Sequence, residues 1–239
     1  MNTVKIEKGN GLMVAHRGVS GLETENTLAA FIAAGNRSYW GVETDVHPTA
    51  DGELILIHDS NTKRVCGDEM IVEETDSAVL KALTVKDFFG EGTRSDLRLP
   101  TLREYVRLCK KYEKICVLEL KEKFSEENVV RVLKTFEEED YVNGVVYITF
   151  HAQNLVYLRQ HAPEAKAQYL SGSLDEEVFG LAVKNRYDLD LRFDLLTEEW
   201  VKRIHDAGLI VNCWTVNDKE IAERLISWGV DMITTNILE

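Results

Sequence analysis

Residues 41–59 read GVETDVHPTADGELILIHD, and this stretch is the most informative feature of the chain. Glu43 and Asp45 stand two positions apart in a β-branched run, so in a strand their side chains share one face, roughly 7 Å apart. Two carboxylates on one face cannot both be buried without a cation or a large change in pKa. The pair therefore indicates a site rather than plain packing.

A second β-like run, residues 54–59, follows the first strand after only seven residues. Parallel strands need a longer crossover, so we expect the chain to turn back as a hairpin near Asp51 and Gly52. Pairing about that turn keeps the sum of the paired residue numbers constant and brings His58 opposite Asp45. The hairpin is therefore expected to join a histidine to the two carboxylates.

The rest of the chain alternates short β-rich runs with helical stretches, the pattern that builds parallel βα units. Eight runs are predicted as strands, at residues 12–16, 41–46, 115–120, 145–149, 166–170, 187–192, 209–214 and 231–234. Eight such units predict an α/β fold closed into a (β/α)₈ TIM barrel.

Residues 47–100 lie outside this repeat and are predicted as a small insertion between the second strand and the second helix. That helix would span residues 101–113. The insertion is mixed and charged in sequence, which suits a cap over the mouth of the barrel.

Two helix starts carry the three-residue spacing of a capping box, Thr101 with Glu104 and Asn217 with Glu220. In this arrangement the two side chains satisfy backbone amides that have no partner within the helix. Gly208 fits a helix stop.

The chain has 239 residues, 44% of them hydrophobic, which is enough for one large core, so residues 1–239 are predicted to form a single domain. Lys and Arg total 28 against 41 for Asp and Glu, a formal charge of -13. Such a balance offers no basic surface for a phosphate backbone, which excludes nucleic acid as the expected partner. An anionic small molecule would need local positive charge.

The N-terminal MNTVKIEKGN lacks the apolar stretch of a signal peptide, and no run of about 18 apolar residues occurs. The four cysteines, Cys66, Cys109, Cys116 and Cys213, show no CxxC spacing and are expected to be reduced. These features predict a soluble cytoplasmic protein without stable membrane association. A homo-oligomer is left open.

Polar residues that close a strand carry weight, because the active sites of such barrels lie at the carboxyl ends of the strands. His16 and Arg17 close the first strand, and Glu119 and Lys121 stand two apart on the third. Each alone has an ordinary explanation as a satisfied core residue or an ion pair. Their convergence with the second strand at one end of the barrel indicates a site.

The chemistry of this set is that of phosphoryl transfer. Glu43, Asp45 and Glu119 form an all-oxygen set, which selects one hard divalent cation, Mg²⁺ or Ca²⁺. Arg17 offers a planar fork for a phosphate group, and Lys121 offers a point charge.

Two histidines complete the predicted machinery. His16 and His58 have ordinary pKa values near neutrality, so they could serve as base and acid on opposite sides of a phosphorus atom. The sequence leaves open whether the nucleophile is water or a hydroxyl of the substrate itself, which would form a cyclic phosphate first.

An ordered series of motifs spans nearly the whole chain and resembles the glycerophosphodiester phosphodiesterases. The motifs are HRG at 16–18, ENTLAAF at 25–31, VETDV at 42–46, TADG at 49–52, HD at 58–59, LELK at 118–121, CWTVND at 213–218 and the closing DMITTN. The resemblance implies a TIM barrel with an insertion after the second strand. It also implies metal-dependent hydrolysis of glycerophosphodiesters to glycerol phosphate and an alcohol.

The resemblance also assigns roles to the candidate residues. His16 and His58 match the catalytic histidines of the family, and Arg17 and Lys121 match its phosphate contacts. Its metal ligands are matched by Glu43, Asp45 and Glu119.

The chain departs from the family pattern at two positions. Thr24 replaces the usual proline, and Asn236 replaces an aspartate that usually follows the last strand. Neither change removes a catalytic group, but the second bears on a contact behind the site.

Several other polar and aromatic residues attract attention. Trp214 and Phe150 follow strands and are expected to contact the glycerol or alcohol moiety, with packing as the alternative. Asp188, Asp190 and Arg192 alternate with leucines and are expected inside the barrel, as an ion-pair layer or as substrate contacts. The remaining histidines are expected to be solvated: His47, His151, His161 and His205.

Two other functions stay open on the same fold. A phosphodiesterase of the lysophospholipase D type would act on a lysophospholipid and predicts an apolar groove in the insertion, where Phe88 and Phe89 lie. A non-catalytic phosphate-binding barrel would lack at least one catalytic group, and all seven candidates are present.

Overall fold

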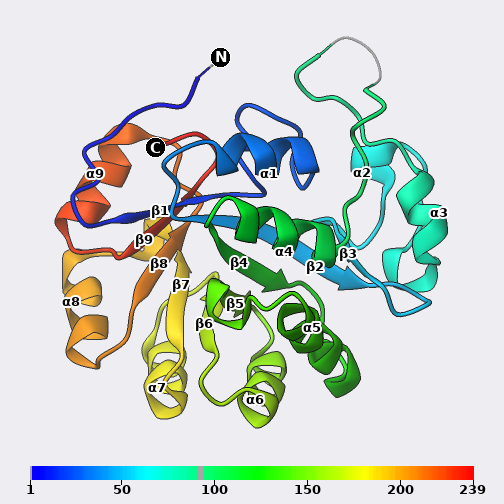
Figure 1. Ribbon diagram of the computed structural model, residues 1–239. Helices are drawn as coiled ribbons and strands as arrows, with labels where there is room; N and C mark the ends of the chain where they lie inside the picture. The colour runs from blue at the N-terminus through cyan, green and yellow to red at the C-terminus, as the bar shows by residue number, and fades with distance from the viewer. Residues whose placement is uncertain (1, 91–93) are drawn as a thin grey trace.

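Eight parallel strands close into a barrel in the computed structural model, which describes residues 2–90 and 94–239 (Figure 1). Closure is direct, because the first strand pairs with both the second and the last. The predicted (β/α)₈ barrel is therefore confirmed. Its strands are β1 (Leu12–Ala15), β2 (Gly41–Pro48), β4 (Ile115–Leu120), β5 (Val145–Thr149), β6 (Lys166–Ser171), β7 (Asp188–Arg192), β8 (Val211–Trp214) and β9 (Met232–Thr235).

Helices follow the strands and surround the barrel (Figure 1). They are α1 (Leu28–Gly35), α4 (Leu102–Lys111), α5 (Glu126–Glu138), α6 (Ala152–His161), α7 (Glu176–Asn185), α8 (Glu198–Asp206) and α9 (Lys219–Ser227), with short 3₁₀ turns η2 (Val142–Gly144) and η3 (Phe193–Leu195). Apolar side chains on the outer faces of the strands, such as Cys116 and Leu118, are fully buried in the layer shared with the helices. None of the helices in the described part of the chain is long and apolar enough to cross a membrane.

One predicted cap is confirmed and another is wrong. Thr101 and Glu104 form a reciprocal capping box at the start of α4. Helix α9 is capped instead by Asp218, whose side chain accepts from the amide of Ile221. Asn217 is occupied elsewhere, because its Oδ1 accepts from the backbone amide of Asn236 at 2.8 Å and ties β9 to the loop before α9.

The hairpin after β2 is confirmed, but its register differs from the prediction by one residue. Strand β3 (Leu54–Leu56) runs antiparallel to β2, with Val46 opposite Leu56. The amide of Ile57, not that of His58, bonds the carbonyl of Asp45, at 3.1 Å. The reason is the loop length: the amide of Thr49 bonds the carbonyl of Glu53, which closes a three-residue loop instead of the expected two-residue turn.

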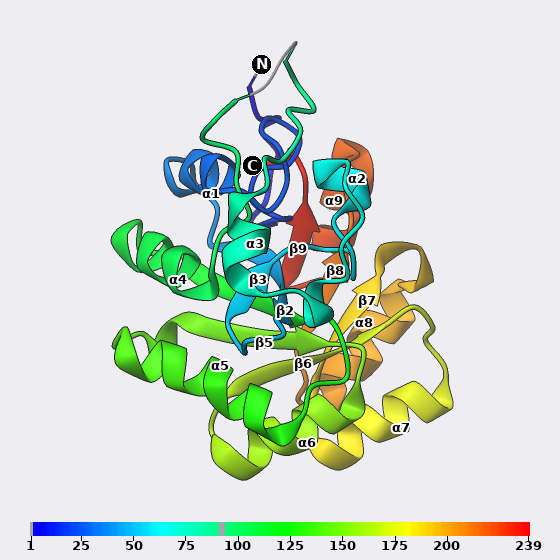
Figure 2. The same cartoon turned by 90° about the vertical axis from the view of Figure 1, so that its right-hand side faces the viewer.

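The segment between β3 and α4 contains α2 (Lys63–Cys66), η1 (Val72–Glu74) and α3 (Ser77–Ala82). These elements lie beside β3 and face the viewer in Figure 2. They pack around an apolar cluster of their own, made of Ile55, Ile57, Val65, Val72, Leu80, Val85, Leu97 and Leu99. Within the range 47–100 predicted as a cap, residues 91–93 lie outside the described residues.

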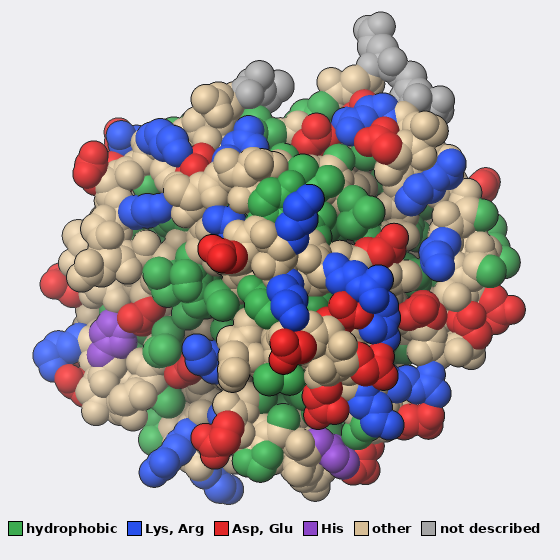
Figure 3. All heavy atoms as spheres, in the orientation of Figure 1, with side chains coloured by type: hydrophobic (Ala, Val, Ile, Leu, Met, Phe, Trp, Pro, Cys, Tyr) green, Lys and Arg blue, Asp and Glu red, His purple; other side chains and the backbone are tan. Residues whose placement is uncertain are grey.

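Charged side chains of both signs cover the outside of the barrel. On the face drawn in Figure 3, Lys and Arg side chains lie interspersed with Asp and Glu side chains. Neighbouring helices are joined in this way, since Arg103 of α4 pairs with Glu138 and Glu139 near the end of α5. Surface pairs of this kind contribute little each to stability but keep the surface polar.

Candidate active site

A cavity of about 290 Å³ opens at the carboxyl ends of the strands. Its lining includes all the predicted site residues except Asp45, which lies just behind it. The lining residues are His16, Arg17, Glu43, His58, Glu119, Lys121, Ile148, Phe150, Leu170, Asp190, Trp214, Thr215 and Thr234. Residues distant in sequence therefore meet here because eight strands deliver their ends to one mouth.

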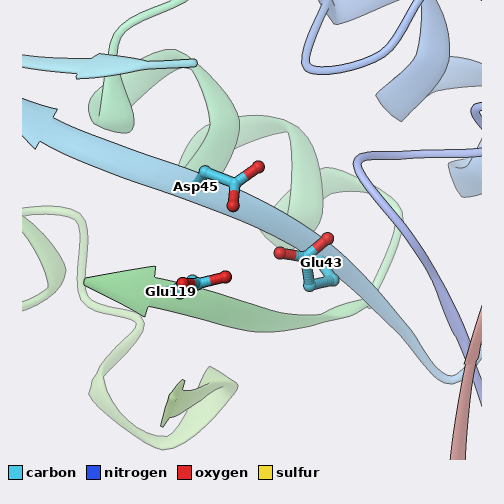
Figure 4. A group of neighbouring side chains, drawn as sticks. All are labelled: Glu43, Asp45 and Glu119. Carbon is cyan, nitrogen blue, oxygen red and sulfur yellow. The ribbon is translucent and has the colours of Figure 1, made fainter. Parts of the chain in front are cut away.

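Three carboxylates converge on one side of the cavity. Glu43 and Asp45 project from β2 toward Glu119 on the neighbouring β4, as Figure 4 shows. All three are buried, and one oxygen from each lies within 4.8 Å of the others. Parallel pairing sets this arrangement, because Asp45 is the register partner of Glu119.

Burial and neighbouring charges shift the pKa values of all three carboxylates. Burial, Asp45 and Glu119, in that order, raise the pKa of Glu43 well above its usual value. Burial and then Asp45 raise the pKa of Glu119 to about 8. Burial acts on Asp45 in the same direction, but Arg17 and Lys121 outweigh it and lower the pKa of Asp45.

The donor set fits a hard divalent cation. All three ligands are carboxylate oxygens, the kind that Mg²⁺ and Ca²⁺ prefer over nitrogen or sulfur. A cation among them would offset the repulsion that raises the pKa values of Glu43 and Glu119. The acidic cluster is thus compatible with a divalent metal site.

Two cationic side chains flank the cluster. Lys121 Nζ lies 3.0 Å from Glu119 Oε1 and 3.5 Å from Asp45 Oδ1. Arg17 Nε lies 3.6 Å from Asp45 Oδ2, and Nη1 donates to Glu25 at 2.9 Å. Both side chains remain on the cavity wall, so they present positive charge to an anion inside it.

The backbone around Arg17 has an unusual conformation. Arg17 and Gly18 both have positive φ, at 52° and 77°, and the amide of Arg17 donates to Glu43 Oε2 at 2.8 Å. A Cβ on Gly18 would lie 2.6 Å from the Cβ of Ala30, so only glycine fits there. This turn aims both His16 and Arg17 into the cavity.

Both predicted histidines line the cavity, and the Nδ1 atom of each is engaged. His16 Nδ1 lies 2.6 Å from Asn236 Oδ1, and His58 Nδ1 lies 2.7 Å from Asp59 Oδ1. These partners are acceptors, so each Nδ1 carries a proton and Nε2 is the nitrogen left for chemistry. Asn236, which stands where the family usually has aspartate, thus still accepts a hydrogen bond from His16.

The two histidines differ in their electrostatic surroundings. Burial and then Arg17 lower the pKa of His16 to about 4. Burial also lowers the pKa of His58, but Asp45 opposes that effect. His16 is therefore neutral at pH 7. For His58, Arg17 and Lys121 add to the effect of burial, while Asp45 and Asp59 act against it.

Sequence reasoning missed the residues that hold these groups. Glu25 binds Arg17, and Arg64 of α2 binds both Glu25 and Asp59. Asn26 donates to Asp45 Oδ2 at 2.8 Å and accepts from a threonine on β2. Glu25 and Asn26 belong to the ENTLAAF motif, which was the available signal, whereas nothing in the sequence marked Arg64.

The aromatic residues form the opposite wall. Phe150 and Trp214 pack edge to face with ring centroids 5.7 Å apart, and both line the cavity. Ile148 and Leu170 continue this wall and join the apolar filling of the barrel interior. The cavity thus has one charged side and one largely apolar side.

Several other expectations are resolved. His47 is not solvated but fully buried on β2, which continues to Pro48 and places it on the face of Glu43 and Asp45. His161 and His205 are exposed as expected, beside Glu126 and Asp231, and His151 is partly buried.

The three charged residues of β7 lie in different environments. Arg192 is exposed and pairs with Asp194, so the predicted interior position is wrong for it. Asp188 accepts from the amide of Ile210 at 2.9 Å, near the start of the strand. Only Asp190 of the three lines the cavity.

Comparisons with known proteins point in one direction. A family model described as the glycerophosphoryl diester phosphodiesterase family matches residues 16–239. A glycerophosphodiester phosphodiesterase of Caldanaerobacter subterraneus is 31% identical over 231 residues, covering 94% of this chain and 93% of that protein.

Solved structures agree. A phosphodiesterase from Oleispira antarctica, in complex with the product sn-glycerol-3-phosphate, has a TM-score of 0.85 at 25% identity and covers 94% of this chain and 92% of that one. A glycerophosphodiester phosphodiesterase from Parabacteroides distasonis has a TM-score of 0.81 at 26% identity, with 96% and 94% covered.

Proposed function

The chain belongs to the glycerophosphoryl diester phosphodiesterase family, and from this premise we propose that it hydrolyses glycerophosphodiesters to glycerol 3-phosphate and an alcohol with the aid of one divalent cation. It is a hydrolase of the phosphodiesterase class. One observation carries the proposal: a single cavity brings together the carboxylate cluster, two cationic side chains and two histidines.

The phosphate would lie between Arg17 and Lys121. The ion pair with Glu25 fixes the orientation of the Arg17 guanidinium. The ammonium of Lys121 lies beside Glu119 of the carboxylate cluster. Oriented positive groups of this kind stabilise charge that develops on phosphoryl oxygens, since they need no reorganisation during reaction.

Glu43, Asp45 and Glu119 would hold the cation, Mg²⁺ or Ca²⁺. When bound, such an ion neutralises phosphoryl oxygens and lowers the pKa of a hydroxyl or water ligand. In its absence the protein's own contribution is to keep the three oxygen donors within 4.8 Å of one another.

The two histidines would move protons through their Nε2 atoms. His16, kept neutral by burial and Arg17, would act as base. His58 would then be the acid, with Asp45 and Asp59 favouring its protonated form against the effect of burial. Asn236 and Asp59 hold the ring orientations through Nδ1. In-line displacement at phosphorus requires the two groups on opposite sides of the phosphate.

Two nucleophiles are consistent with this site. A glycerol hydroxyl of the substrate could attack first and form a cyclic phosphate, favoured by its high effective molarity, or water could attack directly. Phosphorus NMR during turnover separates the two routes, because the cyclic phosphate has its own resonance. Trp214 and Phe150, which line the cavity, would contact the glycerol or alcohol part.

The test is release of glycerol 3-phosphate from glycerophosphocholine, with and without EDTA. We expect activity that EDTA abolishes and that His16→Ala removes. His205→Ala is the matched control, because that histidine is exposed and pairs with Asp231, away from the cavity. Metal-independent turnover, or full activity in His16→Ala, would overturn the mechanism. Faster turnover of lysophosphatidylcholine would favour the lysophospholipase D reading.

A further inference from the structure

Asp190 is a buried acid that the proposed mechanism does not use. It lies on β7 with 1% of its surface exposed and lines the cavity. Its Oδ1 is buried and has no hydrogen-bond partner among the described residues. A buried carboxyl oxygen without a hydrogen-bond partner destabilises the folded protein. A ligand in the cavity could supply the missing donor.

Among the described residues, no Lys, Arg or His side chain pairs with this carboxyl. The cavity's two Lys and Arg side chains, Arg17 and Lys121, are engaged by Glu25, Asp45 and Glu119. No ion pair involves Asp190 within residues 2–90 and 94–239. Burial, and then Glu119, raise the pKa of Asp190 well above its ordinary value.

Aromatic and apolar groups lie beside Asp190 on the cavity wall, and its register partner on β8 is the buried Asn212. The indole N–H of Trp214 reaches the backbone carbonyl of Asp190 at 3.4 Å, so ring and carboxyl belong to one wall. Phe150 packs against Trp214, and Leu170 is the register partner of Asp190 on β6. A carboxyl beside aromatic rings is the chemistry that binds an organic cation.

We propose that Asp190, with Trp214 and Phe150, forms a head-group subsite that binds the ammonium group of an amino alcohol, and so makes the enzyme prefer diesters of amino alcohols over diesters of neutral alcohols. This inference rests on the proposed phosphodiesterase function.

The physical basis is complementarity between the two walls. If the phosphate binds at the charged wall, the alcohol substituent of the diester extends toward the wall formed by β5, β7 and β8. A primary ammonium there supplies an N–H donor to Oδ1 and a positive charge, and that charge favours the ionised form of Asp190 in the complex. It also gains from the faces of Trp214 and Phe150. A quaternary ammonium keeps the charge but has no N–H, so a primary amine is the better fit.

The test compares kcat/KM on glycerophosphoethanolamine and on glycerophosphoglycerol, in the wild type and in Asp190→Asn. The substitution keeps the shape of the side chain and removes the group that can ionise. We expect a loss of about ten- to a hundredfold on the ethanolamine diester, the range for a hydrogen bond to a charged group, and less than about threefold on the glycerol diester.

Asp188→Asn is the matched control. It lies two residues earlier on β7 and bonds a backbone amide, which asparagine can also do through Oδ1. It should leave the ratio of the two kcat/KM values unchanged. Equal losses on both substrates in Asp190→Asn would place the residue at the shared glycerol phosphate or in folding, and unchanged values would remove it from binding. Either result overturns the subsite.

A binding measurement needs no turnover and separates this inference from the proposed function. Saturation-transfer NMR with ethanolamine, against ethylene glycol as the uncharged counterpart, reports the subsite directly. Binding of ethanolamine to the wild type and not to Asp190→Asn supports it even if no diester is cleaved. Equal binding to both proteins overturns it even if diesters are cleaved.

Discussion

Arg64 holds Glu25 with both terminal guanidinium nitrogens, at 3.0 and 2.8 Å, and so ties α2 to the turn that carries Arg17. The same guanidinium binds Asp59 at 2.6 Å, and Asp59 in turn holds His58. One side chain outside the barrel therefore positions Arg17, the proposed phosphate contact, and His58 together.

Arg64→Ala should lower kcat by roughly tenfold or more, because small displacements of positioned groups are costly to rate. Arg64→Lys should recover little, since an ammonium cannot bind two carboxylates as a fork does. Steady-state kinetics on glycerophosphocholine measure both. Lys63→Ala is the control, as Lys63 is the neighbouring residue of α2 and its ammonium pairs with the exposed Glu69. Wild-type kcat in Arg64→Ala would show that the network does not position the site.

Glu43→Gln should weaken binding of the divalent cation. At a concentration about a hundred times Kd, a cation that binds only the folded wild type stabilises it by about 2.7 kcal/mol, or about 5–10 °C in Tm. The variant should lose most of that shift, because an amide carries no charge to offset that of the ion. Calorimetry with and without Mg²⁺ or Ca²⁺ measures it. Glu69→Gln, on the surface, should keep the shift.

Asn236→Asp should move the acid limb of the kcat/KM profile to higher pH. The pKa of His16 is lowered to about 4, and a carboxylate 2.6 Å from Nδ1 would favour the imidazolium and raise that pKa. A higher pKa leaves less neutral His16 at a given pH, so a base is lost earlier on acidification. We expect a shift of about one pH unit or more. An unchanged acid limb would mean that it reports the ionisation of a group other than His16.

Gly18→Ala should destabilise the fold by about 2–4 kcal/mol, because the new Cβ meets Ala30 and the backbone has positive φ. Gly9→Ala separates the two causes. Gly9 also has positive φ, but a Cβ there meets nothing within 4 Å, so about 1–2 kcal/mol is expected. Urea unfolding gives both values. Equal losses would mean that Ala30 yields to the added carbon.

The strand pattern could be read from the sequence because a parallel strand is buried on both faces and shows as a short apolar run. The predicted 115–120 and 145–149 coincide with β4 and β5. Strand ends were less predictable: β2 continues to Pro48, which buries His47 instead of leaving it in a turn. Local sequence does not specify where pairing with β3 stops.

The hairpin illustrates the same limit. Its existence followed from the short connection, but its register depended on whether the loop holds two residues or three. The hydrogen bond from the amide of Thr49 to the carbonyl of Glu53 closes a three-residue loop, and Gly52 takes the positive φ that such a loop requires at its last position.

By itself the sequence determined the barrel and the membership of its charged wall. Alternate residues of a strand point to the same side, which puts Glu43 and Asp45 on one face. His16 and Lys121 lie at the carboxyl ends of their strands, which meet at one mouth of the barrel. Only the tertiary structure decided that Arg64 holds the site from outside and that Asp190, not Arg192, enters the cavity. Periodicity is a property of neighbours in sequence, whereas these contacts depend on how distant segments pack.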